Sequence, residues 1–361
     1  MQPRIIFNTH YQVDEPAYMT FLVKLCTSPV QSNYREVIAE KVAREITSRV
    51  KKLNVAAGGY AVDLAQDLEL TTANNTWSEK GHLLNLIAEV KGEELEDQLK
   101  LNLPEKLLYF RIFLEADGAA FLFMARRLKQ YGSAANSDAT WNSWATELFV
   151  EVYSGYLTLT ANTSDRVGIR QLIDRISSHG YEGKSGSHKI FLHLQTLYRL
   201  GLVERPNSAG SRAYYLSDQF LDAERGLDTL LREIPDILSL EKVIKTKKWI
   251  NVAAKVFQIA CVPYSDVAMQ NDIDRVFSLT ASYYRRIMST GVPLCSLSTL
   301  IEAIQIELLT GQSRLLTYED AMNSIVTAQK ERPKDIRFHV DRRGQPAFIK
   351  LSDDIVRLYS A

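Results

Sequence analysis

Apolar side chains recur every three or four residues over most of the chain, a spacing that places them on one face of an α-helix. Between residues 33 and 53, Val42, Ile46 and Val50 follow this pattern with charged residues between them. The same spacing predicts further helices at 60–68, 103–116, 119–131 and 141–156 and, with breaks at Pro235 and Pro263, within 218–289. We therefore expect a mainly helical protein.

Residues 164–219 contain two predicted helices followed by two predicted strands. The predicted elements are helices at 168–178 and 187–200 and strands at 202–205 and 211–216. A glycine-rich turn at 180–186 separates the helices, and Ser187 is a suitable N-cap for the second. The resulting order is helix, helix, hairpin.

The last part of the chain predicts the same order of elements. Its predicted elements are helices at 297–309 and 318–329 and strands at 336–340 and 347–351. The turn between the strands, residues 341–346, is predicted to be a flexible basic tip. A weaker version of the order, with helices, a short strand and a helix, is predicted before residue 92.

Two helices followed by a hairpin resemble the winged helix-turn-helix superfamily. The best match covers residues 170–217, and residues 197–205 look like the end of a recognition helix that runs into its first wing strand. The resemblance implies a mainly α fold of tandem winged-helix modules with small β-hairpin wings, joined by helical bodies. The expected units are an N-terminal winged-helix-like module (1–92), a helical body (93–163), a central winged-helix module (164–219), a helical linker body (220–292) and a C-terminal winged-helix-like module (293–361).

In that superfamily the second helix commonly lies in the major groove, while the wing reaches phosphates or the minor groove. For the central module the resemblance implies these DNA-facing residues on or before the helix: Lys184, Ser187, His188, Lys189, His193, Gln195 and Thr196. Arg205 and Arg212 would lie on its wing. Lysine and arginine would neutralise phosphates, whereas histidine, glutamine and threonine would contact base edges.

The C-terminal hairpin is the more basic of the two predicted wings. It carries Arg337, His339, Arg342, Arg343 and Lys350. Strand alternation places Arg337 and His339 on one face and the residue between them on the other. An arginine-rich loop of this kind resembles wings that enter a minor groove or follow a phosphate backbone.

A second group of basic residues, Lys242, Lys245, Lys247 and Lys248, precedes Trp249. These residues either form a phosphate-binding patch beside an aromatic ring or are the solvated face of a helix whose other side is apolar. Both alternatives fit the sequence.

Composition constrains the function further. Lys plus Arg and Asp plus Glu both number 43, so any attraction to DNA must be local. Cys26, Cys261 and Cys295 are far apart, which predicts neither a disulfide framework nor a zinc site and fits a cytoplasmic protein, associated with the nucleoid if prokaryotic. Charges interrupt the most apolar windows, so we expect no membrane-spanning helix and no membrane partner.

No enzyme motif is found in the sequence. There is no phosphate-binding glycine loop, no dinucleotide fingerprint and no nucleophile elbow. His188 and His193 are five residues apart, which does not suit metal ligands on one helix face. Glu241 and Lys245 are spaced as an exposed ion pair rather than as part of a nuclease site after Pro235 and Asp236. We therefore expect no catalytic residue, cofactor or metal.

Two functions fit these observations. The first is a non-enzymatic protein that binds double-stranded DNA as the recognition or loading component of a regulatory, defence or genome-maintenance system. The second is a scaffold subunit whose winged helices bind a protein partner or a second copy of the chain. Zero net charge, and the presence of only Lys189 and Arg199 as full positive charges on the central second helix, favour the scaffold.

Overall fold

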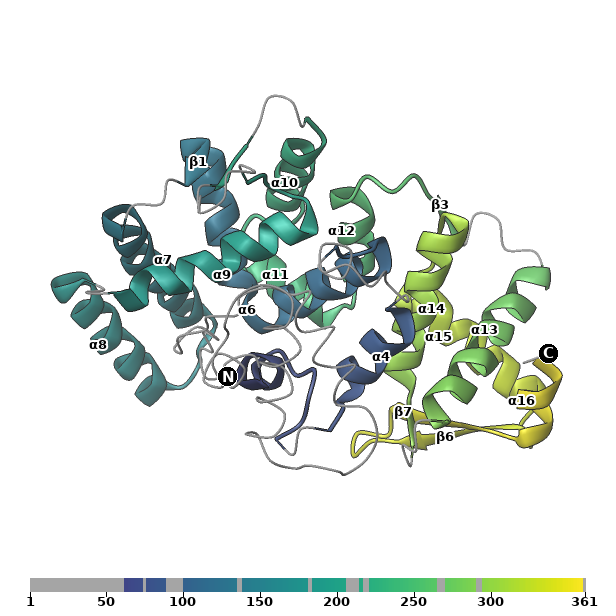
Figure 1. The fold of residues 1–361 in the computed structure, drawn as a ribbon. Helices are drawn as coiled ribbons and strands as arrows, with labels where there is room; N and C mark the ends of the chain where they lie inside the picture. Colours follow the sequence, from purple (N-terminus) through teal and green to yellow (C-terminus); the bar gives the residue numbers. More distant parts are fainter. Residues whose placement is uncertain are drawn as a thin grey trace.

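The structure is a computed structural model that describes residues 62–73, 76–88, 100–134, 138–180, 184–205, 214–216, 221–264, 270–289 and 294–359. The prediction of a mainly helical protein is confirmed, because helices account for most of this part of the chain and the strands are few and short (Figure 1). None of the described helices is both long and apolar enough to cross a membrane. The helix predicted at 33–53 lies outside the described residues.

The centre of the molecule is α6 (Leu103–Tyr131), which is buried over most of its length. It begins at a capping box in which Asn102 and Glu105 satisfy each other's backbone N–H groups, and it ends at Gly132 in a left-handed conformation. The two helices predicted at 103–116 and 119–131 are halves of α6, joined by a kink where Asp117 leaves helical geometry. α7 (Asp138–Leu159) packs against α6.

The segment predicted as the central module forms α8 (Thr163–His179) and α9 (Lys184–Leu200). α9 packs against both α6 and α7, and its residues from Ile190 onward are largely buried. β2 (Tyr214–Tyr215) pairs antiparallel with β1 (Ser133–Ala134), a pairing that the sequence did not predict. The predicted turn at 206–210 and the following residues 211–213 lie outside the described part of the chain.

The helices of the predicted linker body pack against α6 or against the C-terminal helices. They are α10 (Leu221–Glu233), α11 (Ile237–Lys245), α12 (Trp249–Val256) and α13 (Gln270–Met288). The predicted break at Pro235 separates α10 from α11, and Pro263 lies in β3 (Val262–Pro263), after α12. β3 pairs in parallel with β5 (Arg314–Leu315), which connects this body to the C-terminal end of the chain.

The C-terminal unit begins with α13 and continues with β4 (Cys295–Ser296), α14 (Leu297–Gln312), the short β5, α15 (Tyr318–Glu331), β6 (Ile336–Val340), β7 (Pro346–Leu351) and α16 (Asp353–Tyr359). β4, β6 and β7 form one antiparallel sheet in the order β4-β7-β6, whereas β5 pairs with β3. α13 packs against α14, α15 and α16, so this helix of the predicted linker body belongs with the C-terminal helices in space.

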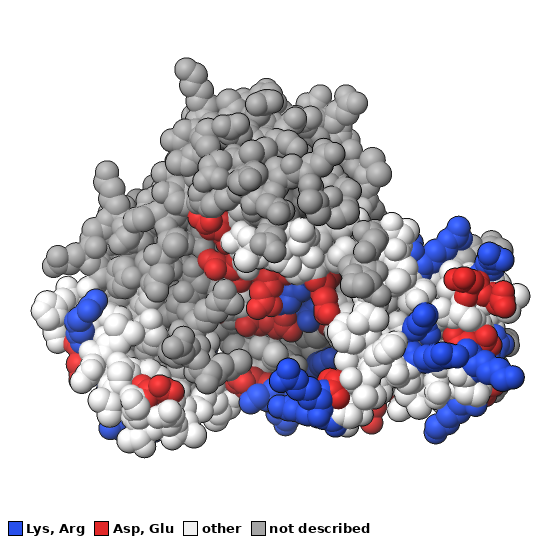
Figure 2. Space-filling model, turned by 90° about the horizontal axis from the view of Figure 1, so that it is seen from below, with Lys and Arg blue, Asp and Glu red and all other residues white. Residues whose placement is uncertain are grey.

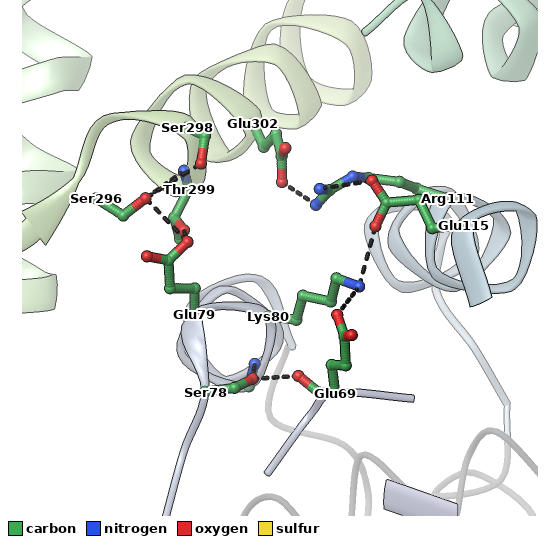
Figure 3. A network of polar contacts seen from close by, with 11 residues as sticks. Glu69, Ser78, Glu79, Lys80, Arg111, Glu115, Ser296, Ser298, Thr299 and Glu302 are labelled. Atoms are coloured by element: carbon green, nitrogen blue, oxygen red, sulfur yellow. Dashed lines mark hydrogen bonds and ion pairs between the residues drawn. The ribbon is translucent and has the colours of Figure 1, made fainter. Parts of the chain in front are cut away.

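Polar contacts join the C-terminal unit to the rest of the protein (Figure 3). Arg111 on α6 contacts Glu302 on α14, and its Nη2 atom lies 3.1 Å from Oε1 of Glu115. The Nζ atom of Lys80 lies 2.8 Å from Glu69 and 3.0 Å from Glu115. We call these five residues the interlock; its Lys80 belongs to α4 (Glu79–Ile87).

A second contact extends the interlock toward the sheet. Oε2 of Glu79 accepts hydrogen bonds from the hydroxyl groups of Ser296 and Thr299, at 3.0 and 3.3 Å (Figure 3). Burial raises the pKa of Glu302 to about 7, although Arg111 opposes this rise. Burial also disfavours the charge on Glu115, but Arg111 and Lys80 outweigh it and lower the pKa of that carboxyl. The contacts of Glu302 and Glu79 thus join α14 and β4, at the edge of the three-stranded sheet, to α6 and α4.

Candidate nucleic-acid interface

The tip of the β6–β7 hairpin is built around Asp341. Its Oδ1 atom accepts hydrogen bonds from the backbone N–H groups of Arg343, at 2.8 Å, and Gln345, at 2.9 Å. The backbone adds a bond from the N–H of Asp341 to the carbonyl of Gln345 and one from the N–H of Gly344 to the carbonyl of Asp341. The tip predicted to be flexible is thus a hydrogen-bonded turn, and Arg342 and Arg343 are both exposed on it.

These bonds also set the charge of the tip. Hydrogen bonds from the backbone of Gln345 and Arg343 lower the pKa of Asp341, so the carboxylate stays ionised at neutral pH. Because Oδ1 accepts two backbone bonds, part of its negative charge is directed inward to the turn. The Arg343 charge also lowers the pKa of Asp341, so the tip carries two arginines against one ionised carboxylate.

The sheet register groups further basic residues on the outer face of the hairpin. Arg337 lies opposite Lys350, and His339 lies opposite Phe348. Cross-strand partners share a face of the sheet, as do residues two apart on a strand. Arg337, His339 and Lys350 are exposed and Phe348 is half-buried. We call these four residues the outer face of the hairpin.

The hairpin is a local concentration of positive charge in a neutral protein. Residues 336–351 contain four Lys and Arg residues and a single acidic residue, Asp341. Figure 2 shows many Lys and Arg side chains, with fewer Asp and Glu side chains among them, over the end of the molecule that carries β6 and β7, whereas acidic and basic side chains lie together near the middle of that view. All five predicted residues of this wing are therefore exposed in one region.

Replacing Gly344 with alanine should lower the free energy of unfolding by about 1 kcal/mol, because Gly344 has a φ of 77° that disfavours side chains while no atom lies near the added Cβ. Gly168 lies inside α8 with equally open space, so G168A should stabilise by roughly 0.5–1 kcal/mol. Urea unfolding of both variants measures the difference. Equal effects in the two variants would show that the tip conformation is not as described.

The structure corrects the prediction that His193, Gln195 and Thr196 face a DNA groove, because all three are fully buried. His193 Nε2 on α9 and Asp117 Oδ2 on α6 lie 3.0 Å apart, and this hydrogen bond joins the two helices. The Thr196 hydroxyl donates to the carbonyl of Leu192 within α9. Gln195 accepts a hydrogen bond from the Tyr214 hydroxyl on β2 at 2.5 Å. These residues hold the core together.

The other predicted contacts of the central module are only partly described. Lys184, Ser187, His188 and Lys189 lie in the first turns of α9, and their side chains are outside the described part of the chain. Arg212 lies outside it altogether. Arg205 is half-buried, with its guanidinium 5.8 Å from the centre of the Tyr214 ring and 3.5 Å from Gln195 Oε1. Arg205 therefore packs on the buried side of this unit.

The lysines before Trp249 do not form one cluster. Lys245 is exposed and makes the predicted ion pair with Glu241, at 3.1 Å. The Lys247 ammonium lies 3.9 Å from the centre of the Tyr318 ring on α15. Lys248 is exposed. The solvated-surface interpretation accounts for Lys245, while Lys247 connects the linker body to α15.

Sequence reasoning missed two features of the hairpin. The role of Asp341 had a signal, since aspartate at the first position and glycine at the fourth are typical of a type I turn. The position of Phe348 on the basic face follows only from the register, which a bulge between His339 and Val340 shifts by one residue. Among the described residues, no group of three His, Cys, Asp or Glu side chains could hold a metal ion. A comparison of the chain with protein-family models, curated proteins and solved structures finds no match.

Proposed function

We propose that this protein is a non-enzymatic nucleic-acid-binding protein whose contact surface is the β6–β7 hairpin, acting as the wing of a winged helix. The order of elements from α13 to β7 and the sheet order β4-β7-β6 support this fold for the C-terminal unit. The protein would serve as a recognition or loading component of a regulatory, defence or genome-maintenance system.

The observation that carries the proposal is the exposure of five basic or titratable side chains on one short hairpin. Arg342 and Arg343 extend from a tip whose backbone its own hydrogen bonds hold in one conformation. Little backbone conformational entropy is therefore lost when the tip binds. Arg337 and Lys350 add two charges on the adjoining outer face. Phosphate oxygens are the natural partners of such a group.

The helix before the hairpin does not support reading of bases. The exposed side of α15 carries Glu319, Asn323, Thr327, Lys330 and Glu331. With two carboxylates and one ammonium, this surface has a net negative charge, which disfavours its approach to the phosphates that flank a major groove. We infer that the hairpin makes the main contacts and that binding depends little on sequence.

A salt series on a 20-base-pair duplex tests the proposal. Three or four phosphate contacts predict a slope of log K against log salt of roughly −3 to −4. Two duplexes of unrelated sequence should give the same slope and affinities within about threefold, since phosphate contacts carry no sequence information. An affinity that does not change with salt would rule out the proposed contacts.

A scaffold that binds protein partners is the second candidate, and the burial of α9 favours it. From Ile190 onward α9 is largely buried against α6 and α7, so this part of the helix offers little surface to DNA. Arg205 likewise packs on Tyr214 and does not extend the basic surface of the hairpin. Recovery of a stable protein complex together with no duplex binding at 20 mM salt would favour this function over the first.

A further inference from the structure

The outer face of the hairpin combines an aromatic ring with positive charge, and we propose that it binds single-stranded nucleic acid by stacking an unpaired base on Phe348. This inference rests on the proposed function and specifies its substrate class. It assigns the phosphates to the cations of the tip and the outer face, and the base to the Phe348 ring.

The register places Phe348 among groups that suit a nucleotide. Its direct neighbour across the ladder is the exposed His339 on one side, the side open to a nucleotide, and on the other Ser296 of β4, which is buried and bonded to Glu79. Lys350 lies two residues along the same strand, and Arg337 lies opposite Lys350. Residues two apart on a strand or diagonal across the ladder are roughly 7–8 Å apart, a distance that long lysine and arginine side chains span, so both cations can reach the phosphate of a nucleotide whose base covers the ring.

Phe348 differs from the other phenylalanine of the hairpin. Phe338 lies on the opposite face, in register with the buried Ile349, and packs against the hydrophobic core. Phe348 shares its face with exposed polar side chains and is itself half-buried. An aromatic ring in that position adds little to the core, whereas an aromatic ring beside cations is the usual platform for a stacked base.

Stacking on Phe348 requires an unpaired base. In a duplex the faces of the bases are covered by their neighbours in the stack, and only their edges are accessible in the grooves. In a single strand the bases can be separated and placed on aromatic rings, while a positive surface follows the backbone. The arginines of the tip bind phosphates in either case, so the ring should discriminate between the two forms.

The test compares a 12-residue oligothymidine strand with a 12-base-pair duplex by fluorescence anisotropy. Wild-type protein should bind the single strand more tightly. F348L keeps an apolar side chain but removes the ring, so it should weaken single-strand binding about tenfold and leave duplex binding within about twofold. F348W retains a stacking surface and should bind the single strand at least as tightly as wild type, which keeps the test valid if F348L folds poorly.

A matched control is Y131L, because Tyr131 is a 55% exposed aromatic residue at the end of α6, outside the hairpin. This variant should bind both forms as wild type does. Tighter binding of wild type to the duplex, or an equal loss of both affinities in F348L, would overturn this inference while leaving the proposed function in place. If wild type binds neither form at low salt, the proposed function fails and the inference fails with it.

Discussion

Replacing Arg111 with methionine should lower the free energy of unfolding by about 3–5 kcal/mol at pH 9, where the buried Glu302 would have to be ionised without its partner, and by less at pH 6, where this carboxyl binds a proton instead. Glu302 is only 5% exposed, and the Arg111 guanidinium contacts it from the facing helix. Methionine retains much of the apolar stem of the side chain, although it removes the guanidinium that lies 5.9 Å from the centre of the Trp249 ring. The loss should therefore come mainly from the charge, and urea unfolding followed by circular dichroism measures it.

The double variant R111M/E302L distinguishes a buried charge from a general loss of packing. Removing both partners together should restore most of the stability, since apolar replacements of a buried ion pair are often neutral or stabilising. K245A breaks the exposed ion pair with Glu241 and should cost less than about 1 kcal/mol. If R111M cost no more than K245A, the interlock would not hold the C-terminal unit in place.

Replacing His193 with alanine should cost at least about 3 kcal/mol. His193 and Asp117 are 0% and 1% exposed, and they join α9 to the kink of α6. The substitution leaves the Asp117 carboxyl without this hydrogen bond and opens a cavity in the core. Thermal and urea unfolding, followed at the aromatic residues, measure the loss.

The effect of H193A should depend on pH. Burial raises the pKa of Asp117 and His193 opposes this, so the folded protein holds the proton more tightly than the unfolded chain, and stability falls as pH rises above the ordinary value of 3.8. Without His193 the shift grows, and the destabilisation should be larger at pH 8 than at pH 5. D117N should reduce this dependence, and equal losses of H193A at both pH values would contradict this assignment.

Local patterns predicted the helices and the hairpin because both depend on residues close in sequence. The alternation around Phe338 placed Arg337 and His339 on one face, as the structure has them. The prediction for α9 was wrong because it took the polar character of His193, Gln195 and Thr196 as a sign of exposure, whereas His193 and Thr196 lie at helical spacing from the buried Ile190, Leu197 and Leu200. In the core His193 and Gln195 bond to Asp117 on α6 and Tyr214 on β2, which are far away in the sequence, while the Thr196 hydroxyl bonds within α9.

The interlock and the full basic face were beyond prediction for the same physical reason. Arg111 and Glu302 are separated by 191 residues, and nothing near either one indicates the other. The cations of the C-terminal wing were visible in the sequence, whereas the place of Phe348 among them depends on a bulge in the ladder. Sequence thus predicts which residues are charged and which faces are apolar, while tertiary packing decides which polar residues remain exposed.

The most direct test of nucleic-acid binding by the hairpin is a comparison of two double variants on the same labelled oligonucleotides. R342A/R343A removes two charges from the tip, while R170A/R175A removes two exposed charges from α8 at the opposite end of the molecule (Figure 1). In a salt series, R342A/R343A should reduce the magnitude of the slope of log K against log salt by about 2, and R170A/R175A should behave as wild type. Equal binding by both variants and wild type would contradict the assignment of the hairpin as the contact surface.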